Sequence, residues 1–179
     1  MADRGALHPW LMRALFAALT GALVFVRLLP LETIPPAWTG PDLFVALAFA
    51  WAVRRPEYVP PLLVAGLAVA LDLLFHRPPG LWAALTLLGC EALRARAPGL
   101  RDRTFVADWA AVTGALVAMT LAYRLILGVM MVDQPPLGLS LMQLLSTIIA
   151  YPVVAGLSHL VLGVRKQAPG DLATSRRLP

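Results

Sequence analysis

Three charged residues lie inside apolar stretches of this 179-residue chain: Asp72, Arg27 and Arg124. On insertion scales a charge at the middle of a membrane costs about 2.5–3.5 kcal/mol, so such a residue normally binds a substrate, carries protons or pairs with another charge. The sequence places no second acid at the depth of Asp72 that could complete a proton relay. It therefore favours an ion pair that joins helices over a substrate or proton site.

Arg27 is the expected partner of Asp72. Each lies two or three residues before the outer end of its apolar segment, so their depths in a membrane match. Arg124 lies about eight residues before the end of its own segment and is the alternative partner, whereas Arg77 can reach the aqueous surface. Small residues precede Asp72 at helical spacing and would let a neighbouring helix approach closely: Pro61, Ala65 and Ala68. Asp72 should therefore face protein.

Other residues capable of catalysis are scattered. The three histidines, His8, His76 and His159, fall near the ends of different apolar segments, and Cys90, the only cysteine, lies inside one. This distribution predicts no metal cluster and no shared base. The serines lack a nucleophile-elbow context, and no Gly-rich phosphate loop is present. We therefore expect a non-enzymatic protein without a cofactor.

The composition indicates an all-α integral membrane protein. The chain is 59% hydrophobic and 14% charged, and its mean hydropathy is +0.75, which is too apolar for a soluble domain. A net charge of +5 would suggest nucleic acid as the partner of a soluble protein. Because the basic residues lie between apolar segments, membrane orientation explains them, and no nucleic-acid partner is expected.

Six apolar segments are expected to form a transmembrane domain over residues 1–164, with a flexible cytoplasmic tail over 165–179. The first is too long for the apolar core of a signal peptide. The second covers only about 20 Å as a helix, so it must begin in the preceding loop, thin the bilayer or be sheltered by its neighbours. The segments are Trp10–Leu29, Pro41–Val53, Tyr58–Phe75, Gly80–Leu93, Phe105–Val132 and Leu137–Val164.

Basic residues predict the orientation. With six spans, twelve of them fall on one side and Arg77 alone on the other, so the positive-inside rule places both termini in the cytoplasm. Omitting either short segment would separate the basic clusters. The polar loop Arg94–Thr104 carries four arginines and is expected to lie on anionic lipid headgroups. The twelve are Arg4, Arg13, Arg54, Arg55, Arg94, Arg96, Arg101, Arg103, Arg165, Lys166, Arg176 and Arg177.

Periodic patterns predict how the helices pack. The first segment has a small face and a polar face, which indicates packing on two sides: Ala14, Ala18 and Ala22 against Arg13, Thr20 and Arg27. The fifth segment also has specialised stripes on opposite sides, so we expect it to be central. Pro152 predicts a kink in the sixth. Polar side chains expected to pair within or between helices are Glu91 with Arg94, and Gln143, Thr147 and Ser158.

The order of certain residues resembles the rod-shape-determining protein MreD family. The matching features are Pro41-Asp42, an apolar run to Trp51, Arg55-Pro56, Gly66, Leu71-Asp72-Leu73-Leu74 and Pro79-Gly80-Leu81. The resemblance implies a multi-pass protein of the bacterial inner membrane that acts as a scaffold in the cell-elongation complex, which synthesises peptidoglycan and maintains cell shape. It implies an MreC-like bitopic partner and, indirectly, actin-like MreB and peptidoglycan synthases. The implied fold is similar to the substrate-binding components of energy-coupling-factor transporters.

That similarity supplies the alternative function, a vitamin- or metabolite-binding component of a membrane transporter. Two features oppose it. The loops predicted on the outer side are short, which leaves little chain to form a lid over a ligand. The basic cytoplasmic loops carry no recognisable motif for docking an ATPase.

Overall fold

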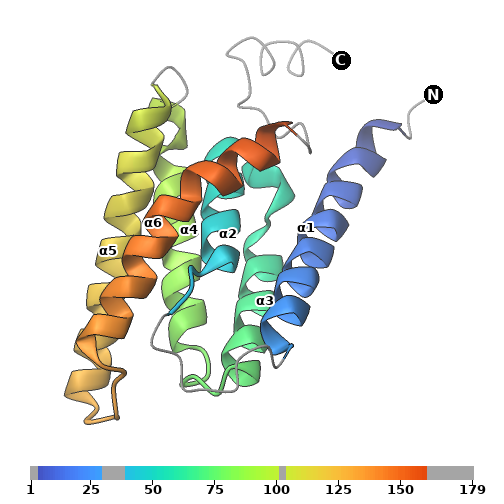
Figure 1. The fold of residues 1–179 in the computed structure, drawn as a ribbon. Helices are drawn as coiled ribbons and strands as arrows, with labels where there is room; N and C mark the ends of the chain where they lie inside the picture. Colours follow the sequence, from blue (N-terminus) through green and yellow to red (C-terminus); the bar gives the residue numbers. More distant parts are fainter. Residues whose placement is uncertain (1–3, 30–38, 101–103, 161–179) are drawn as a thin grey trace.

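The computed structural model describes residues 4–29, 39–100 and 104–160, and within these ranges the chain is all-helical with no strand (Figure 1). The predicted all-α class is confirmed. The helices are α1 (Arg4–Leu28), α2 (Leu43–Arg54), α3 (Pro61–Leu74), α4 (Leu81–Leu100), α5 (Phe105–Val129) and α6 (Leu137–Leu160), with a 3-10 turn, η1 (Pro56–Tyr58), between α2 and α3.

The short helix α2 lies at the centre of the bundle, where it packs against α4, α6, α1 and η1. Every residue from 44 to 53 is buried. The run is apolar on all of its faces, as expected for a helix surrounded by others. Of the three possibilities for this short segment, shelter by its neighbours is the correct one. The prediction that the fifth helix is central was wrong, because α5 lies at the edge of the bundle (Figure 1).

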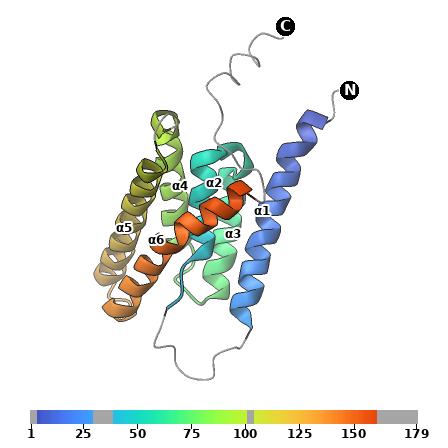
Figure 2. The ribbon, with the colours of Figure 1, turned by 45° about the horizontal axis from the view of Figure 1, so that its top comes forward.

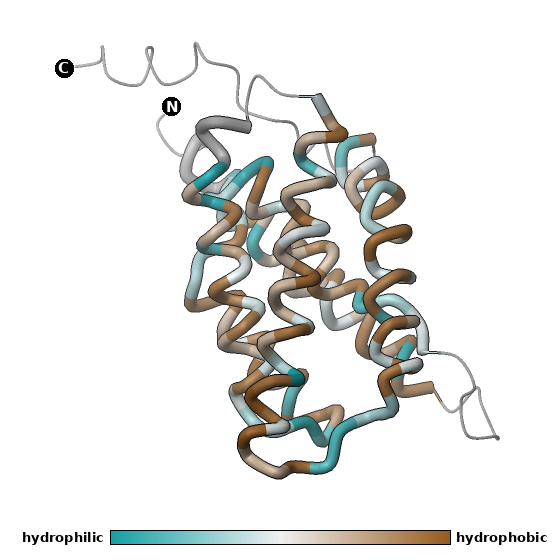
Figure 3. Tube along the Cα trace, turned by 90° about the vertical axis from the view of Figure 1, so that its left-hand side faces the viewer, coloured by the Kyte–Doolittle hydropathy of each residue, from teal (hydrophilic) through white to brown (hydrophobic). Residues whose placement is uncertain are grey.

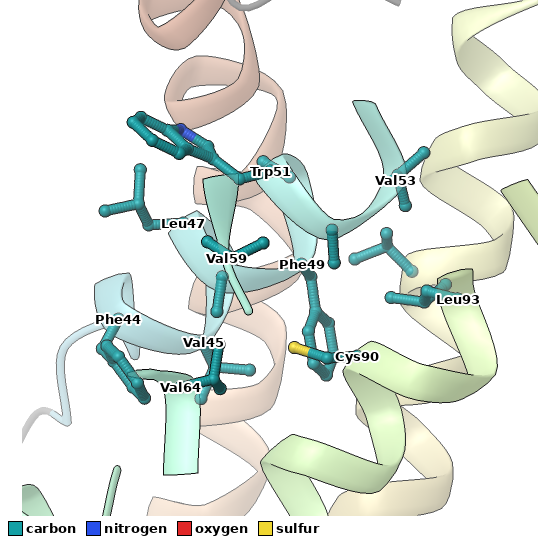
Figure 4. Packing of buried hydrophobic residues seen from close by; sticks show 14 of the residues in the cluster. Phe44, Val45, Leu47, Phe49, Trp51, Val53, Val59, Val64, Cys90 and Leu93 are labelled. Carbon is teal, nitrogen blue, oxygen red and sulfur yellow. The ribbon is translucent and has the colours of Figure 1, made fainter. Parts of the chain in front are cut away.

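Close packing of α2 on α4 depends on a glycine. A Cβ at Gly89 would lie 2.5 Å from Cζ of Phe49, so any side chain there would displace the ring. Figure 4 shows Phe49 beside Cys90 in this core. On the far side of α2, the fully buried Trp51 contacts the Phe16 ring, with centroids 5.4 Å apart, and donates a 3.2 Å hydrogen bond from Nε1 to Ser158 Oγ.

The helices alternate in direction, so α1, α3 and α5 finish at the end where α2, α4 and α6 begin (Figures 1 and 2). This end is called the outer end below, after the predicted topology. Three of the described helices are long and apolar enough to cross a membrane: His8–Leu28 within α1, α5 and α6. The apolar helices α2 and α3 are shorter. Hydrophobic residues predominate along the middle of the bundle (Figure 3).

Several predicted boundaries change. Helix α4 continues to Leu100, so most of the expected polar loop Arg94–Thr104 is helical. Helix α6 contains Pro152 and changes direction along its length (Figure 1), in agreement with the predicted kink. Residues 161–164 and the predicted tail, 165–179, lie outside the described residues.

The basic asymmetry gives a prediction about orientation. In a Cys90→Ala background, a cysteine replacing Asp133 in the exposed α5–α6 turn is expected to react with an impermeant maleimide added to intact cells. A cysteine replacing the exposed Arg96 near the other end of the bundle is expected to react only after permeabilisation. Labelling of the Arg96→Cys variant in intact cells would show that the orientation is the opposite of the predicted one.

Candidate functional site

Asp72, near the end of α3, holds the start of α4. Its side chain is fully buried, and its Oδ2 accepts hydrogen bonds from the backbone N–H groups of Gly80 (3.0 Å) and Ala83 (3.1 Å). The first N–H groups of a helix have no partner within the helix, and a carboxylate beside them also meets the positive end of the helix dipole. Asp72 therefore serves as a cap for α4 that the preceding helix supplies, and the prediction that it faces protein is confirmed.

The turn between α3 and α4 requires Gly80. Its φ of +85° lies in the region that side chains disfavour, and this conformation directs its N–H to the Asp72 carboxylate. The backbone N–H of Arg77 also donates to the backbone oxygen of Asp72, at 2.9 Å. The Leu-Asp and Pro-Gly-Leu features of the family resemblance thus correspond to a short, tightly bonded connection between two helices.

Asp42 joins four parts of the outer end. Its Oδ1 accepts a 3.2 Å hydrogen bond from the backbone N–H of Val45 and so caps α2. Its Oδ2 accepts from Nε1 of Trp82 on α4 at 3.2 Å and lies 3.5 Å from Nη1 of Arg77. The backbone N–H of Asp42 donates to Oγ1 of Thr147 on α6 at 2.9 Å. The residue is 8% exposed, so these contacts are largely sheltered from water.

Aromatic rings lie beside the guanidinium groups of Arg77 and Arg27 at the outer end. The Arg77 guanidinium carbon lies 5.2 Å from the ring centroid of Trp82 and 5.7 Å from that of Phe75. The corresponding atom of Arg27 lies 5.9 Å from the Phe75 centroid. Trp82 in turn meets the Tyr123 ring edge-on at 5.0 Å. Each guanidinium is therefore within the range of a cation–π attraction.

The expected ion pair between Asp72 and Arg27 is wrong. Arg27 donates from Nη2 to the backbone oxygens of Gly40 (3.2 Å) and Pro41 (2.6 Å), just before α2. Asp72 instead accepts the backbone hydrogen bonds of α4. The physical reason is that the unpaired N–H groups at the start of α4 lie only a short turn away from Asp72, whereas Arg27 is exposed and donates to the carbonyl groups of Gly40 and Pro41.

The alternative, a contact of Asp72 with Arg124, is also wrong. Arg124 donates from Nη1 to the backbone oxygen of Pro135 (3.0 Å) and to Oγ of Ser140 (2.8 Å). Its own backbone oxygen accepts a 3.0 Å hydrogen bond from Nε2 of Gln134. Arg124 therefore closes the turn between α5 and α6. The ion pair that does form in this region uses Arg77, which was expected to reach the aqueous surface.

A cavity of about 620 Å³ opens at the outer end among α2, α5, α6 and the α3–α4 turn. All three arginines discussed above line it, together with Asp42 and Asp133. Its other polar lining residues include Tyr123, Ser140, Gln143 and Thr147, and its apolar walls include Val45, Phe75, Trp82, Leu116 and Leu127. Within the described residues, no group of three or more His, Cys, Asp or Glu side chains could hold a metal ion.

At the opposite end, arginines bond backbone oxygens. Arg54 donates to Ala155 on α6, Arg94 donates to Val59, and Arg13 donates from Nε to Glu57 at 3.1 Å. The predicted pair of Arg94 with Glu91 is confirmed. These contacts connect α1, α2 and α4 to the segment around η1 and to α6.

The remaining residues of the family resemblance have plain structural positions. Arg55 lies 3.3 Å from Glu57 in an ion pair, and Pro56 begins η1. Gly66 is exposed on α3, with open space where a Cβ would be. On α6, Thr147 and Ser158 are confirmed as partners in hydrogen bonds between helices.

A second hollow of about 610 Å³ opens sideways between α1 and α6 over α2. Its walls are apolar except for Ser158; they include Ala22 and Val26 of α1, Leu47 of α2, and Ala150 and Val153 of α6. This hollow is called the lateral groove below. The predicted small face of α1 meets this groove at Ala22. Ala14, Ala18 and Ala22 are all exposed, whereas Thr20 on the other face is buried. The expectation that α1 packs on two sides therefore holds for one side only within this chain.

Sequence reasoning missed that Arg77 and Trp82 meet at Asp42. Thr147, which was expected to bond between helices, also contacts Asp42, from a distant part of the chain. A signal for Asp42 itself was present, because an Asp directly before an apolar helical run is typical of a helix N-cap. Comparison of the chain with protein-family models, with curated proteins and with solved structures finds no match.

Proposed function

We propose that this protein is a non-enzymatic scaffold in the bacterial inner membrane, within the cell-elongation complex that synthesises peptidoglycan. The observation that carries the proposal is that the charges expected inside the membrane have structural partners. Asp72 caps α4, Arg27 bonds the chain before α2, and Arg124 closes the α5–α6 turn. These contacts hold helix ends and turns in place, which is the role expected of charged groups in a scaffold.

The proposed partner is an MreC-like bitopic protein, through which MreB-like filaments and peptidoglycan synthases would associate indirectly. We assign its single transmembrane helix to the small face of α1 and the adjacent lateral groove. Small residues spaced four apart allow the backbones of two membrane helices to approach closely, which is how such helices gain packing energy in lipid. Lipid chains gain nothing comparable from such a face, so a helix is the better occupant.

The scaffold proposal includes six membrane crossings with both termini in the cytoplasm. Helices α2 and α3 are too short to span a bilayer alone, at about 18 and 21 Å. The neighbours of α2 bury every residue from 44 to 53, so this short helix does not need to match the thickness of the bilayer by itself. The alternating direction of the six helices agrees with an even number of crossings.

Enlarging the small face tests the partner assignment. Ala18→Leu is expected to reduce co-purification of a bitopic membrane protein by roughly tenfold, because an added isobutyl group separates the two helix backbones. The thermal stability of the isolated protein should stay unchanged, because Ala18 is exposed. The measurement is affinity purification from membranes with quantitative mass spectrometry.

Ala118→Leu is the matched control, since Ala118 is also exposed near the middle of a long helix, α5. Equal retention of the partner by both variants would remove the assignment to α1. The alternative function, a metabolite-binding transporter component, predicts co-purification of an ATPase module in place of a bitopic protein. Recovery of an ATPase module with the wild-type protein would contradict the scaffold proposal and support the transporter alternative.

A further inference from the structure

The outer cavity has an excess of positive charge. Its lining includes three guanidinium groups and two carboxylates, of which Asp42 is already engaged by Arg77. Arg27 and Arg124 donate hydrogen bonds to backbone and hydroxyl oxygen atoms, which are neutral, so these contacts do not neutralise their charges. Each guanidinium has five N–H donors, which leaves donors beyond those used in these contacts.

The backbone adds to this positive potential. Helices α2, α4 and α6 all begin at the outer end, and each contributes residues near its start to the cavity lining: Asp42, Trp82 and Ser140. The start of a helix carries roughly half a positive charge. Carboxylates already cap two of these helix starts, because Asp42 caps α2 and Asp72 caps α4. The start of α6 lies against the cavity at Ser140, which accepts a hydrogen bond from Arg124.

The cavity exists because the central helix is short. Helix α2 has 12 residues and α5 has 25, about 18 and 37 Å in length. The neighbours of α2 therefore extend past its first residues. The space between Val45 and the outer end is lined by Leu116, Leu127 and aromatic rings. A volume near 620 Å³ falls within the range of small-molecule sites. The polar part of the lining has three arginines against two carboxylates, with neutral polar groups between them, and the rest of the lining is apolar.

We infer that the outer cavity binds a phosphate-bearing amphiphile, with the phosphate at Arg124 beside the start of α6 and an apolar group against the wall formed by Leu116 and Trp82. Arginine is suited to phosphate because its planar fork donates two parallel hydrogen bonds. Two sources share this chemistry: the headgroup of an anionic phospholipid of the outer leaflet, and a soluble phosphate monoester with an alkyl or aryl group.

The two sources are distinguished by native mass spectrometry of the full-length protein. The first probe is short-chain phosphatidylglycerol, with phosphatidylcholine of equal chain length as the zwitterionic comparison. The second is hexyl phosphate, with inorganic phosphate as the comparison that lacks an apolar group. We expect one adduct per protein for phosphatidylglycerol, for hexyl phosphate or for both, and weaker binding of each comparison molecule.

Arg124→Gln is expected to weaken that binding by roughly tenfold or more, the effect of losing one charged hydrogen-bond donor. Arg96→Gln, an exposed arginine near the opposite end, is the control and should leave the Kd unchanged. Because Arg124 also closes a turn, a second variant leaves every arginine in place. Thr120→Phe fills the cavity from α5 and is expected to abolish binding while the thermal midpoint stays within a few degrees of the wild type.

The outcomes separate clearly. Loss of phosphatidylglycerol binding in both cavity variants identifies a lipid site, and the same pattern with hexyl phosphate identifies a site for a soluble ester. Equal retention of phosphatidylcholine and phosphatidylglycerol would overturn the proposal. Binding that Arg124→Gln and Thr120→Phe leave as strong as in Arg96→Gln would also overturn it. The scaffold proposal depends on partner retention, so neither result of this experiment decides it.

Discussion

Replacing Asp72 with alanine is expected to lower the free energy of unfolding by about 3–5 kcal/mol. The change removes the acceptor of two backbone hydrogen bonds, and each N–H group left without a partner costs about 1–3 kcal/mol. It also removes a negative charge from the start of α4, where the helix dipole favours one. The measurement is reversible unfolding of the purified protein in mixed micelles of mild detergent and sodium dodecyl sulfate.

Asp72→Asn is the matched variant for this prediction. Its amide oxygen can still accept from Gly80 and Ala83, but its NH₂ group would occupy the place of Oδ1, which has no hydrogen-bond partner among the described residues. We expect roughly half of the loss seen with alanine. Asp72→Ala with unchanged stability would contradict the capping role.

A double-mutant cycle between Asp72 and Arg27 belongs to the same experiment. Because the two side chains have different partners, their effects should add to within about 0.5 kcal/mol. A coupling energy above about 1 kcal/mol would support the ion pair that was predicted from the matched depths of the two residues. The structure-based expectation and the sequence-based one are thus separated by one measured quantity.

The failure of the predicted ion pair between Asp72 and Arg27 shows which positional information residue spacing provides. Counting residues from the end of a helix estimates the depth of Asp72 and Arg27 along the bundle, but not their direction around it. Two charges at equal depth on α3 and α1 can therefore point to different neighbours. The start of α4 was a competitor that the same sequence did contain, because every helix begins with N–H groups that lack partners.

The central place of α2 could have been predicted in part. The run from Leu43 to Val53 has no polar face, and its length is too small for a span, which together indicate shelter by other helices. The choice of α5 as the centre gave too much weight to small residues such as Ala118. In a membrane, a small face can contact another chain or lipid, and Ala118 is exposed here.

The boundary of α4 opposite the outer end was misread for a different reason. The residues Arg94, Ala95 and Arg96 are good helix formers, yet their polarity was taken to mark the end of the helix. Polarity marks the edge of the apolar layer, whereas the backbone can remain helical beyond it, as α4 does up to Leu100. The outer cavity could not be predicted at all, because it follows from the difference in length between packed helices.

Asp42→Ala is expected to cost about 2.5–5 kcal/mol of unfolding free energy, although Asp42 lines a cavity. Loss of the α2 cap costs about 1 kcal/mol, and loss of the charged hydrogen bond from Trp82 costs about 1.5–3 kcal/mol. The ion pair with Arg77 adds at most about 1 kcal/mol, because that side chain is 21% exposed and water screens it. The same unfolding assay measures the sum.

Three further substitutions show which contact of Asp42 matters. Asp133→Ala removes a carboxylate from the same cavity, but Asp133 is exposed, so its cost should stay within about 0.5 kcal/mol. Asp42→Asn keeps an oxygen that can cap α2, but its NH₂ group cannot accept from Trp82 and the ion pair is lost, so it should cost about 1.5–4 kcal/mol. Arg77→Ala should add little in the Asp42→Ala background, where its partner is already absent. Equal stability of the Asp42→Ala and Asp133→Ala variants would contradict the junction described here, because it would mean that α2 does not depend on this carboxylate for its position against α4.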